Sequence, residues 1–146
     1  SGAPDAGKIV ALDGTGRLDL TFMPVGLGTE AVVLTTSEAL AAGDVVNIWV
    51  SSGTKVRKAD ATTAGKEAHG FVLASATSGG SATVYLEGAD TQVTGLTPGS
   101  RVYLATTAGG VTNTCPSASG NEMQQVGVAT SATSFTFSAQ LSVTKI

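Results

Sequence analysis

Two residue types that often serve as catalytic base and nucleophile occur once each in this sequence, as His69 and Cys115. Histidine titrates near neutral pH and can transfer protons, and a cysteine thiolate is a strong nucleophile. His69 is the only histidine, and Cys115 is the only cysteine, in a polar loop over 114–117 that contains no histidine. We therefore expect His69 to be a structural strand residue, Cys115 to be a free, half-buried thiol, and the chain to have no enzymatic activity. A hydrolase would need His69 in a pocket beside a serine, Cys115 or a carboxylate.

Ten of the eleven carboxylates are spread along the chain and fall mostly in predicted turns: Asp13, Asp19, Asp44, Asp60, Asp90, Glu30, Glu38, Glu67, Glu87 and Glu122. None of their spacings matches a calcium loop, and a single cysteine cannot provide a zinc site. The glycine-rich pieces at 14–16 and 26–28 lack the rest of a phosphate-binding fingerprint. We expect no metal and no cofactor.

The overall charge argues against nucleic acid as a partner. The formal net charge of the 146 residues is −3, and Lys55, Arg57 and Lys58 form the only basic cluster, whereas phosphate binding needs a broad basic surface. No apolar run approaches the roughly 20 residues of a membrane span, and no signal-peptide pattern opens the sequence. We expect neither a nucleic-acid nor a membrane partner.

Short apolar runs separated by Gly, Ser, Thr and Asp clusters predict an all-β fold. The expected strands cover 31–35, 44–50, 54–58, 68–75, 81–88, 100–105, 122–130 and 133–139. One short helix is expected over 37–42, between a Ser or Thr cap and Gly43. Large side chains are scarce, since aromatic residues make up only 5% of the chain. Association with further copies would therefore help to stabilise it.

An internal repeat connects the two halves of the chain. Segments 42–48, 53–56, 69–72 and 83–86 match segments 98–104, 108–111, 126–129 and 134–137, in the same order. In both halves a glycine, Gly70 or Gly127, opens the third strand, which marks a bulge or a close backbone approach. The repeat predicts two diverged copies of a small four-stranded barrel or sandwich unit, 29–94 and 95–146, packed as one body.

Residues 1–28 lie outside the repeat and are rich in glycine. We interpret them as an extended arm whose apolar residues lie on a partner surface, by analogy with strand addition. Trp49, the only tryptophan, fits core packing and interface burial equally well. The candidate partner-contacting residues are Ile9, Leu12, Leu18, Leu20, Phe22, Met23, Val25 and Trp49.

Six segments share a signature of turns and strands: 42–46, 56–62, 68–72 and 82–88 in the first half and 95–99 and 120–129 in the second. Through these segments, residues 40 to 140 bear a resemblance to the capsid cement, or head decoration, proteins of bacteriophages. It implies a β-rich subunit, often a trimer, that clamps adjacent major capsid proteins on the outside of the shell. The expected location is therefore the capsid exterior of a virion, after synthesis in the bacterial cytoplasm.

Similar modules occur in tail fibres, so a receptor-binding module of a phage tail is the alternative function. A decoration protein would be present in many copies over the head, whereas a fibre would be fixed in few copies at the tail.

Overall fold

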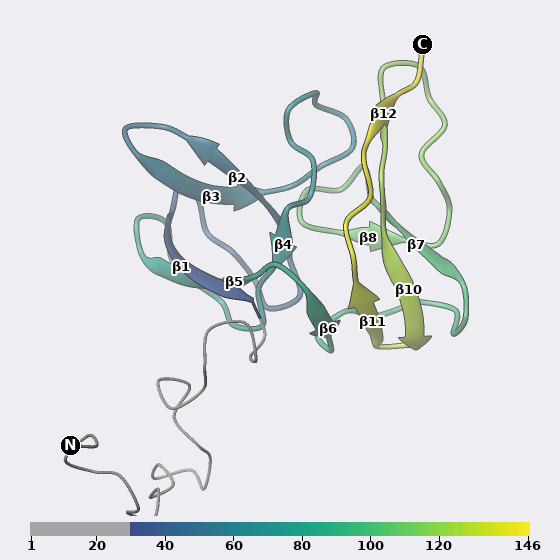
Figure 1. The fold of residues 1–146 in the computed structure, drawn as a ribbon, viewed down its shortest axis with the longest axis horizontal. Helices are drawn as coiled ribbons and strands as arrows, with labels where there is room; N and C mark the ends of the chain where they lie inside the picture. Colours follow the sequence, from purple (N-terminus) through teal and green to yellow (C-terminus); the bar gives the residue numbers. More distant parts are fainter. Residues whose placement is uncertain (1–29) are drawn as a thin grey trace, which may run out of the picture.

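The computed structural model describes residues 30–146, and these form an all-β body (Figure 1). Seven of the eight candidate partner residues, those between Ile9 and Val25, lie outside the described residues, as does the arm itself. In the described part no helix is long and apolar enough to cross a membrane.

The first sheet closes into a five-stranded barrel in the order β1-β3-β2-β4-β5. Its strands are β1 (Ala31–Thr36), β2 (Val45–Val50), β3 (Thr54–Lys58), β4 (Gly70–Phe71) and β5 (Ser81–Tyr85). Neighbouring strands are antiparallel except β1 and β3, which are parallel. Because β1 pairs with β5 on one side and β3 on the other, this sheet has no free edge.

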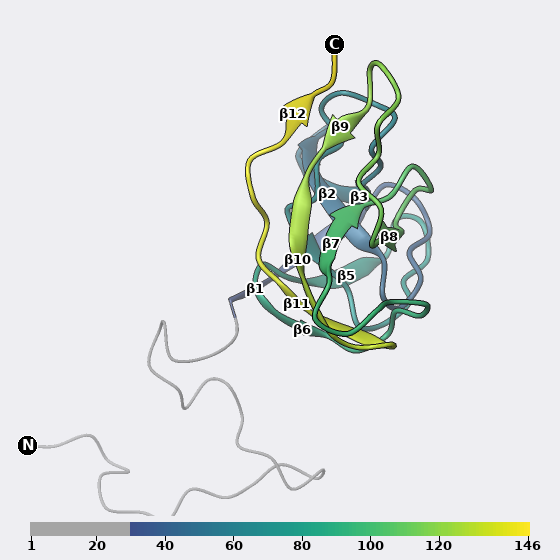
Figure 2. The same ribbon diagram turned by 90° about the vertical axis from the view of Figure 1, so that its right-hand side faces the viewer.

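The second sheet is open, with the order β6-β11-β10-β7-β8. It contains β6 (Gly88–Asp90), β7 (Arg101–Leu104), β8 (Val111–Thr112), β10 (Gln125–Ser131) and β11 (Ser134–Phe137), and a small third sheet pairs β9 (Glu122–Met123) with β12 (Val143–Thr144). Figures 1 and 2 place β12 at the opposite end of the body from the start of β1.

The all-β prediction is confirmed, but several predicted strands are shorter or divided. The span 68–75 contains only β4, 81–88 is divided between β5 and β6, and 122–130 between β9 and β10. Each of the two larger sheets has five strands rather than the expected four.

The helix predicted over 37–42 is wrong. Leu40 instead forms an isolated bridge with Ala76, with backbone hydrogen bonds of 2.9 and 3.0 Å in the two directions. Its side chain is buried in the barrel core. Long-range pairing and burial thus outweigh the weak helical preference of a very short segment.

Two hydrophobic cores stabilise the body. One belongs to the barrel and its connections and comprises Leu40, Val46, Val56, Val72, Ala82 and Val84. The other is shared: Val45 and Phe71 of the barrel pack with residues of the second sheet, including Phe135 and Phe137. The Phe71 and Phe137 rings lie 5.5 Å apart, centroid to centroid. The barrel and the second sheet therefore bury apolar surface against each other.

Candidate interaction surface

Trp49 lies on β2, half-buried. Its indole N–H donates to Ser37 Oγ at 3.1 Å, and the Arg57 guanidinium carbon lies 4.3 Å from the centroid of its ring. Arg57 also donates to Asn47 Oδ1 at 2.9 Å and to the Gly65 carbonyl at 2.8 Å. Trp49 is thus fixed by a hydrogen bond and a cation–π contact while part of its surface stays open.

His69 is exposed and precedes β4. Its Nδ1 accepts the Ile48 N–H at 3.0 Å, and its own backbone N–H donates to the Val46 carbonyl at 2.8 Å. Both bonds connect the start of β4 to β2. One ring nitrogen of His69 is therefore engaged in a structural bond, although His69 lies just before β4 and not within the strand predicted for it.

Cys115 is a free, half-buried thiol, as predicted. It lines a surface hollow between the β7–β8 hairpin and the loop that follows β8. Within residues 30–146, no group of three or more His, Cys, Asp or Glu side chains could hold a metal ion.

Two buried carboxylates, Asp60 and Asp90, have pKa values shifted in opposite directions. Burial raises the pKa of Asp60, but hydrogen bonds from Thr62 and Lys66 outweigh it, so this pKa lies below the ordinary value of 3.8. Burial raises the pKa of Asp90 above the same value, the Gln92 N–H opposes that shift, and the Asp44 carboxylate adds to it. Oδ2 of Asp90 has no hydrogen-bond partner among residues 30–146. Asp60 is thus stabilised as a carboxylate, and Asp90 is not.

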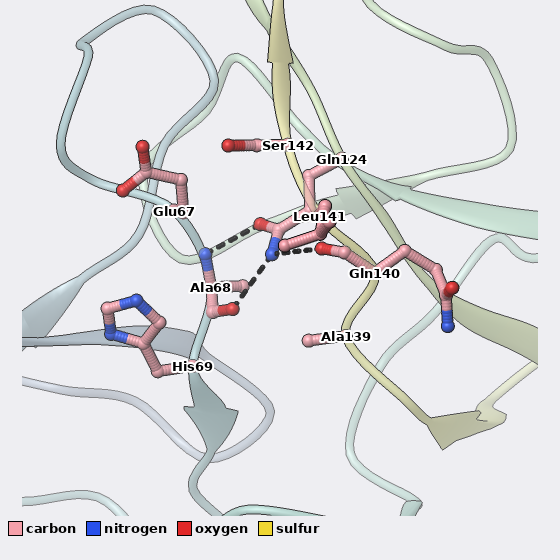
Figure 3. A pocket seen from close by; sticks show the side chains of 8 residues that line it. All are labelled: Glu67, Ala68, His69, Gln124, Ala139, Gln140, Leu141 and Ser142. Atoms are coloured by element: carbon pink, nitrogen blue, oxygen red, sulfur yellow. Dashed lines mark hydrogen bonds between the residues drawn. The ribbon is translucent and has the colours of Figure 1, made fainter.

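A groove of about 540 Å³ separates the segment before β4 from the C-terminal tail, by which we mean residues 139–146 (Figure 3). Gln124, only 3% exposed, lies between its two walls. The Gln124 amide accepts the Ala68 N–H at 2.7 Å and donates to the carbonyls of Ala68 at 3.0 Å and Gln140 at 3.1 Å. One side chain therefore connects the barrel, the second half of the chain and the tail.

The groove also brings together the residue types that a hydrolase would need, His69, Glu67 and Ser142. No hydrogen bond joins these three side chains, and Figure 3 shows His69 and Ser142 on opposite walls. The arrangement therefore lacks the contact between nucleophile and base that nucleophilic catalysis uses.

The C-terminal tail carries apolar side chains that nothing in the described body covers. Leu141 is 94% exposed and Val143 59% exposed, and Ile146 is also exposed. Sequence reasoning missed this surface because the last strand was expected to end at 139. The alternation of apolar Leu141 and Val143 with polar Ser142 and Thr144 was the available signal for a further strand.

The chain matches no protein-family model and no curated protein.

Proposed function

We propose that this chain is a non-enzymatic structural subunit of a bacteriophage virion, a head decoration or cement protein. In this proposal it is a homo-oligomer, with a trimer favoured, that binds the outer capsid surface and stabilises contacts between major capsid proteins. The resemblance of residues 40 to 140 to phage cement proteins suggests the role.

The observation that carries the proposal is the uncovered apolar surface of the body. Leu141, Val143 and Ile146 lie together on the C-terminal tail, whereas Val33 and Val50 are single exposed valines on the barrel. A single exposed valine is ordinary, but several apolar side chains on one short segment favour burial against a partner. A subunit that works by adding contact area at joints between other proteins needs such a surface.

We further propose that the body consists of two diverged copies of one β-unit. The spatial strand order β5-β4-β2-β3 in the barrel has the counterpart β11-β10-β7-β8 in the open sheet, and β1 lies beside β5 as β6 lies beside β11. Three backbone hydrogen bonds recur at matching positions of the repeat. Each is given as N–H donor to carbonyl acceptor, first copy then second copy: Leu40 to Ala76 matches Leu96 to Ala132; Gly43 to Val72 matches Gly99 to Ala129; Val72 to Asp44 matches Ala129 to Ser100.

The shared core supports a mechanical role for these two units. Backbone hydrogen bonds also connect them, from Val45 to Gly109, from Gly109 to Ala59 and from Ala61 to Ala105, at 2.7 to 2.9 Å. Two units held in this way move together. Force applied at one end of the body would therefore be transmitted to the other.

The proposal assigns capsid attachment to the apolar arm, around residues 8–25, and deletion of residues 1–28 tests it. We expect the truncated protein to keep its β-sheet circular dichroism and Trp49 fluorescence but to lose most binding to capsids that lack the native protein. A full-length Ile9→Asp, Leu12→Asp variant should behave in the same way, whereas Thr15→Asp, which adds a charge at a polar position of the arm, should bind nearly normally. Undiminished binding by the truncated protein would refute the role of the arm.

Quantitative densitometry of purified virions distinguishes a decoration protein of the head from a tail-fibre module. Many copies per particle, lost together with head stability when the protein is omitted, would support the decoration role. A few copies that fractionate with tails would instead support a tail-fibre module.

A further inference from the structure

The C-terminal tail presents an apolar face and a free backbone edge at the same place. Leu141 and Val143 are two residues apart, so in an extended strand their side chains lie on one face. β12 pairs antiparallel with β9 through Val143 with Met123 and Thr144 with Glu122. The other edge of β12 has no strand partner within residues 30–146.

Hydrogen bonds within the body hold the tail in a defined position without a partner. Thr144 Oγ1 donates to Glu122 Oε1 at 2.7 Å, Lys145 N–H donates to the Asn121 carbonyl at 2.9 Å, and Gln140 N–H donates to the Gln125 carbonyl at 2.9 Å. An ordered edge loses less conformational entropy on binding than a mobile one. The free edge of β12 is thus a prepared template for one more strand.

The chain contains a segment whose pattern fits this template. Leu18, Leu20 and Phe22 alternate with polar Asp19 and Thr21, which is the pattern of a strand with one apolar face. Their two-residue spacing equals that of Leu141 and Val143, so cross-strand apolar pairs can form on one face.

We propose that residues 18–22 of a neighbouring copy add as a strand to the free edge of β12, with their apolar side chains against Leu141 and Val143. The inference deepens the proposed homo-oligomer and rests on it, but it does not require capsid binding. Each copy would give its arm to one neighbour and receive an arm from another. Such a head-to-tail contact forms a closed ring when the rotation between copies allows it.

A neighbouring copy is favoured as the source because of where β1 begins. Phe22 is separated from Glu30 by a link that spans at most roughly 29 Å when fully extended. The start of β1 and β12 lie at opposite ends of the body in both views (Figures 1 and 2). An arm that folded back onto its own tail would have to cover the length of the body.

Disulfide trapping in the full-length protein tests the contact. In a Cys115→Ser background, one tagged chain carries Leu20→Cys, and a differently tagged chain carries Leu141→Cys or Val143→Cys. After mixing and mild oxidation, we expect mixed disulfide dimers with either tail cysteine and few with the matched control Val50→Cys, another exposed apolar position. Yields of mixed dimers no higher than with the control would overturn the proposal. A chain that carries both Leu20→Cys and Leu141→Cys would also overturn it if its disulfide formed only within one chain.

Sedimentation analysis gives an independent readout without capsids. Leu141→Asp should weaken self-association by at least about tenfold, which corresponds to about 1.4 kcal/mol, and Val50→Asp should leave it unchanged. A monomeric wild-type protein would overturn both this inference and the proposed oligomer. An oligomer whose self-association is unchanged by Leu141→Asp would overturn this inference but not the proposed oligomer.

Discussion

The buried amide of Gln124 makes a reciprocal pair of hydrogen bonds with the backbone of Ala68, accepting its N–H at 2.7 Å and donating to its carbonyl at 3.0 Å. A neighbouring β-strand would satisfy Ala68 in the same way. The glutamine therefore takes the place of a strand at the junction between the barrel and the second half of the chain.

Replacing Gln124 by leucine should destabilise the protein by roughly 2 to 5 kcal/mol, because both backbone groups of Ala68 would be buried without partners. Gln140→Ala is the matched control, since Gln140 offers its backbone carbonyl to this cluster and has an exposed side chain. Urea denaturation measures both variants. Equal midpoints for Gln124→Leu and Gln140→Ala would contradict the structural role of the amide.

Phe137→Ala should destabilise the barrel as well as the sheet that contains Phe137. Its ring packs on Phe71 of β4 in the shared core, and loss of a buried phenylalanine costs about 3 to 5 kcal/mol. Trp49 fluorescence reports on the barrel alone, because Trp49 is the only tryptophan. We expect its unfolding midpoint to fall together with that of the far-ultraviolet circular dichroism. An unchanged Trp49 transition would mean that the two parts unfold separately.

Gly70→Val should be far more destabilising than Gly79→Ala. A Cβ at Gly70 would lie 2.5 Å from the Tyr85 carbonyl oxygen and 2.7 Å from Val84 Cγ1, in a closed barrel that cannot open to receive it. We expect a loss of more than about 3 kcal/mol. At Gly79 the space is open and only the positive φ of 78° opposes a side chain, at about 1 to 2 kcal/mol. Thermal denaturation of both variants checks the order.

Asp90→Asn should stabilise the protein more at neutral pH than in acid. The pKa of Asp90 is raised by burial above 3.8, so the unfolded chain ionises first as the pH rises, and the folded state then bears the cost of a buried charge. Each unit by which the folded pKa exceeds 3.8 is worth about 1.4 kcal/mol at pH 7. The difference in unfolding free energy between variant and wild type should therefore shrink as the pH falls toward 3.8. A difference independent of pH would contradict this assignment.

Asp60→Asn should show the opposite dependence. Hydrogen bonds from Thr62 and Lys66 hold the pKa of Asp60 below 3.8, so its contribution is present above that pH and is lost as the pH falls through the lower folded pKa. We expect a loss of about 1 to 2 kcal/mol at pH 7 and none in strong acid. The same denaturation series measured from neutral to acidic pH tests it, with Asp90→Asn as the variant of opposite sign.

The sequence by itself determined the fold class and the places of the longest strands. Runs rich in valine and isoleucine, such as 44–50, form strands because branched side chains suit an extended, half-buried backbone. The glycine at 70 could be recognised as a close approach, and Cys115 as a free thiol. These features depend on residues near one another in the chain, so local patterns reveal them.

Only the tertiary structure decided which strands pair and which polar groups become buried. The parallel pairing of Thr35 with Lys55 closes the barrel. Leu40 pairs with Ala76 through backbone hydrogen bonds and does not form the predicted helix. Gln124 bonds to Ala68, which is 56 residues away in the chain. The strength of these contacts depends on burial and on partners far away in sequence. For the same reason the exposed face of Leu141 and Val143 became evident only when the rest of the chain had folded and left it uncovered.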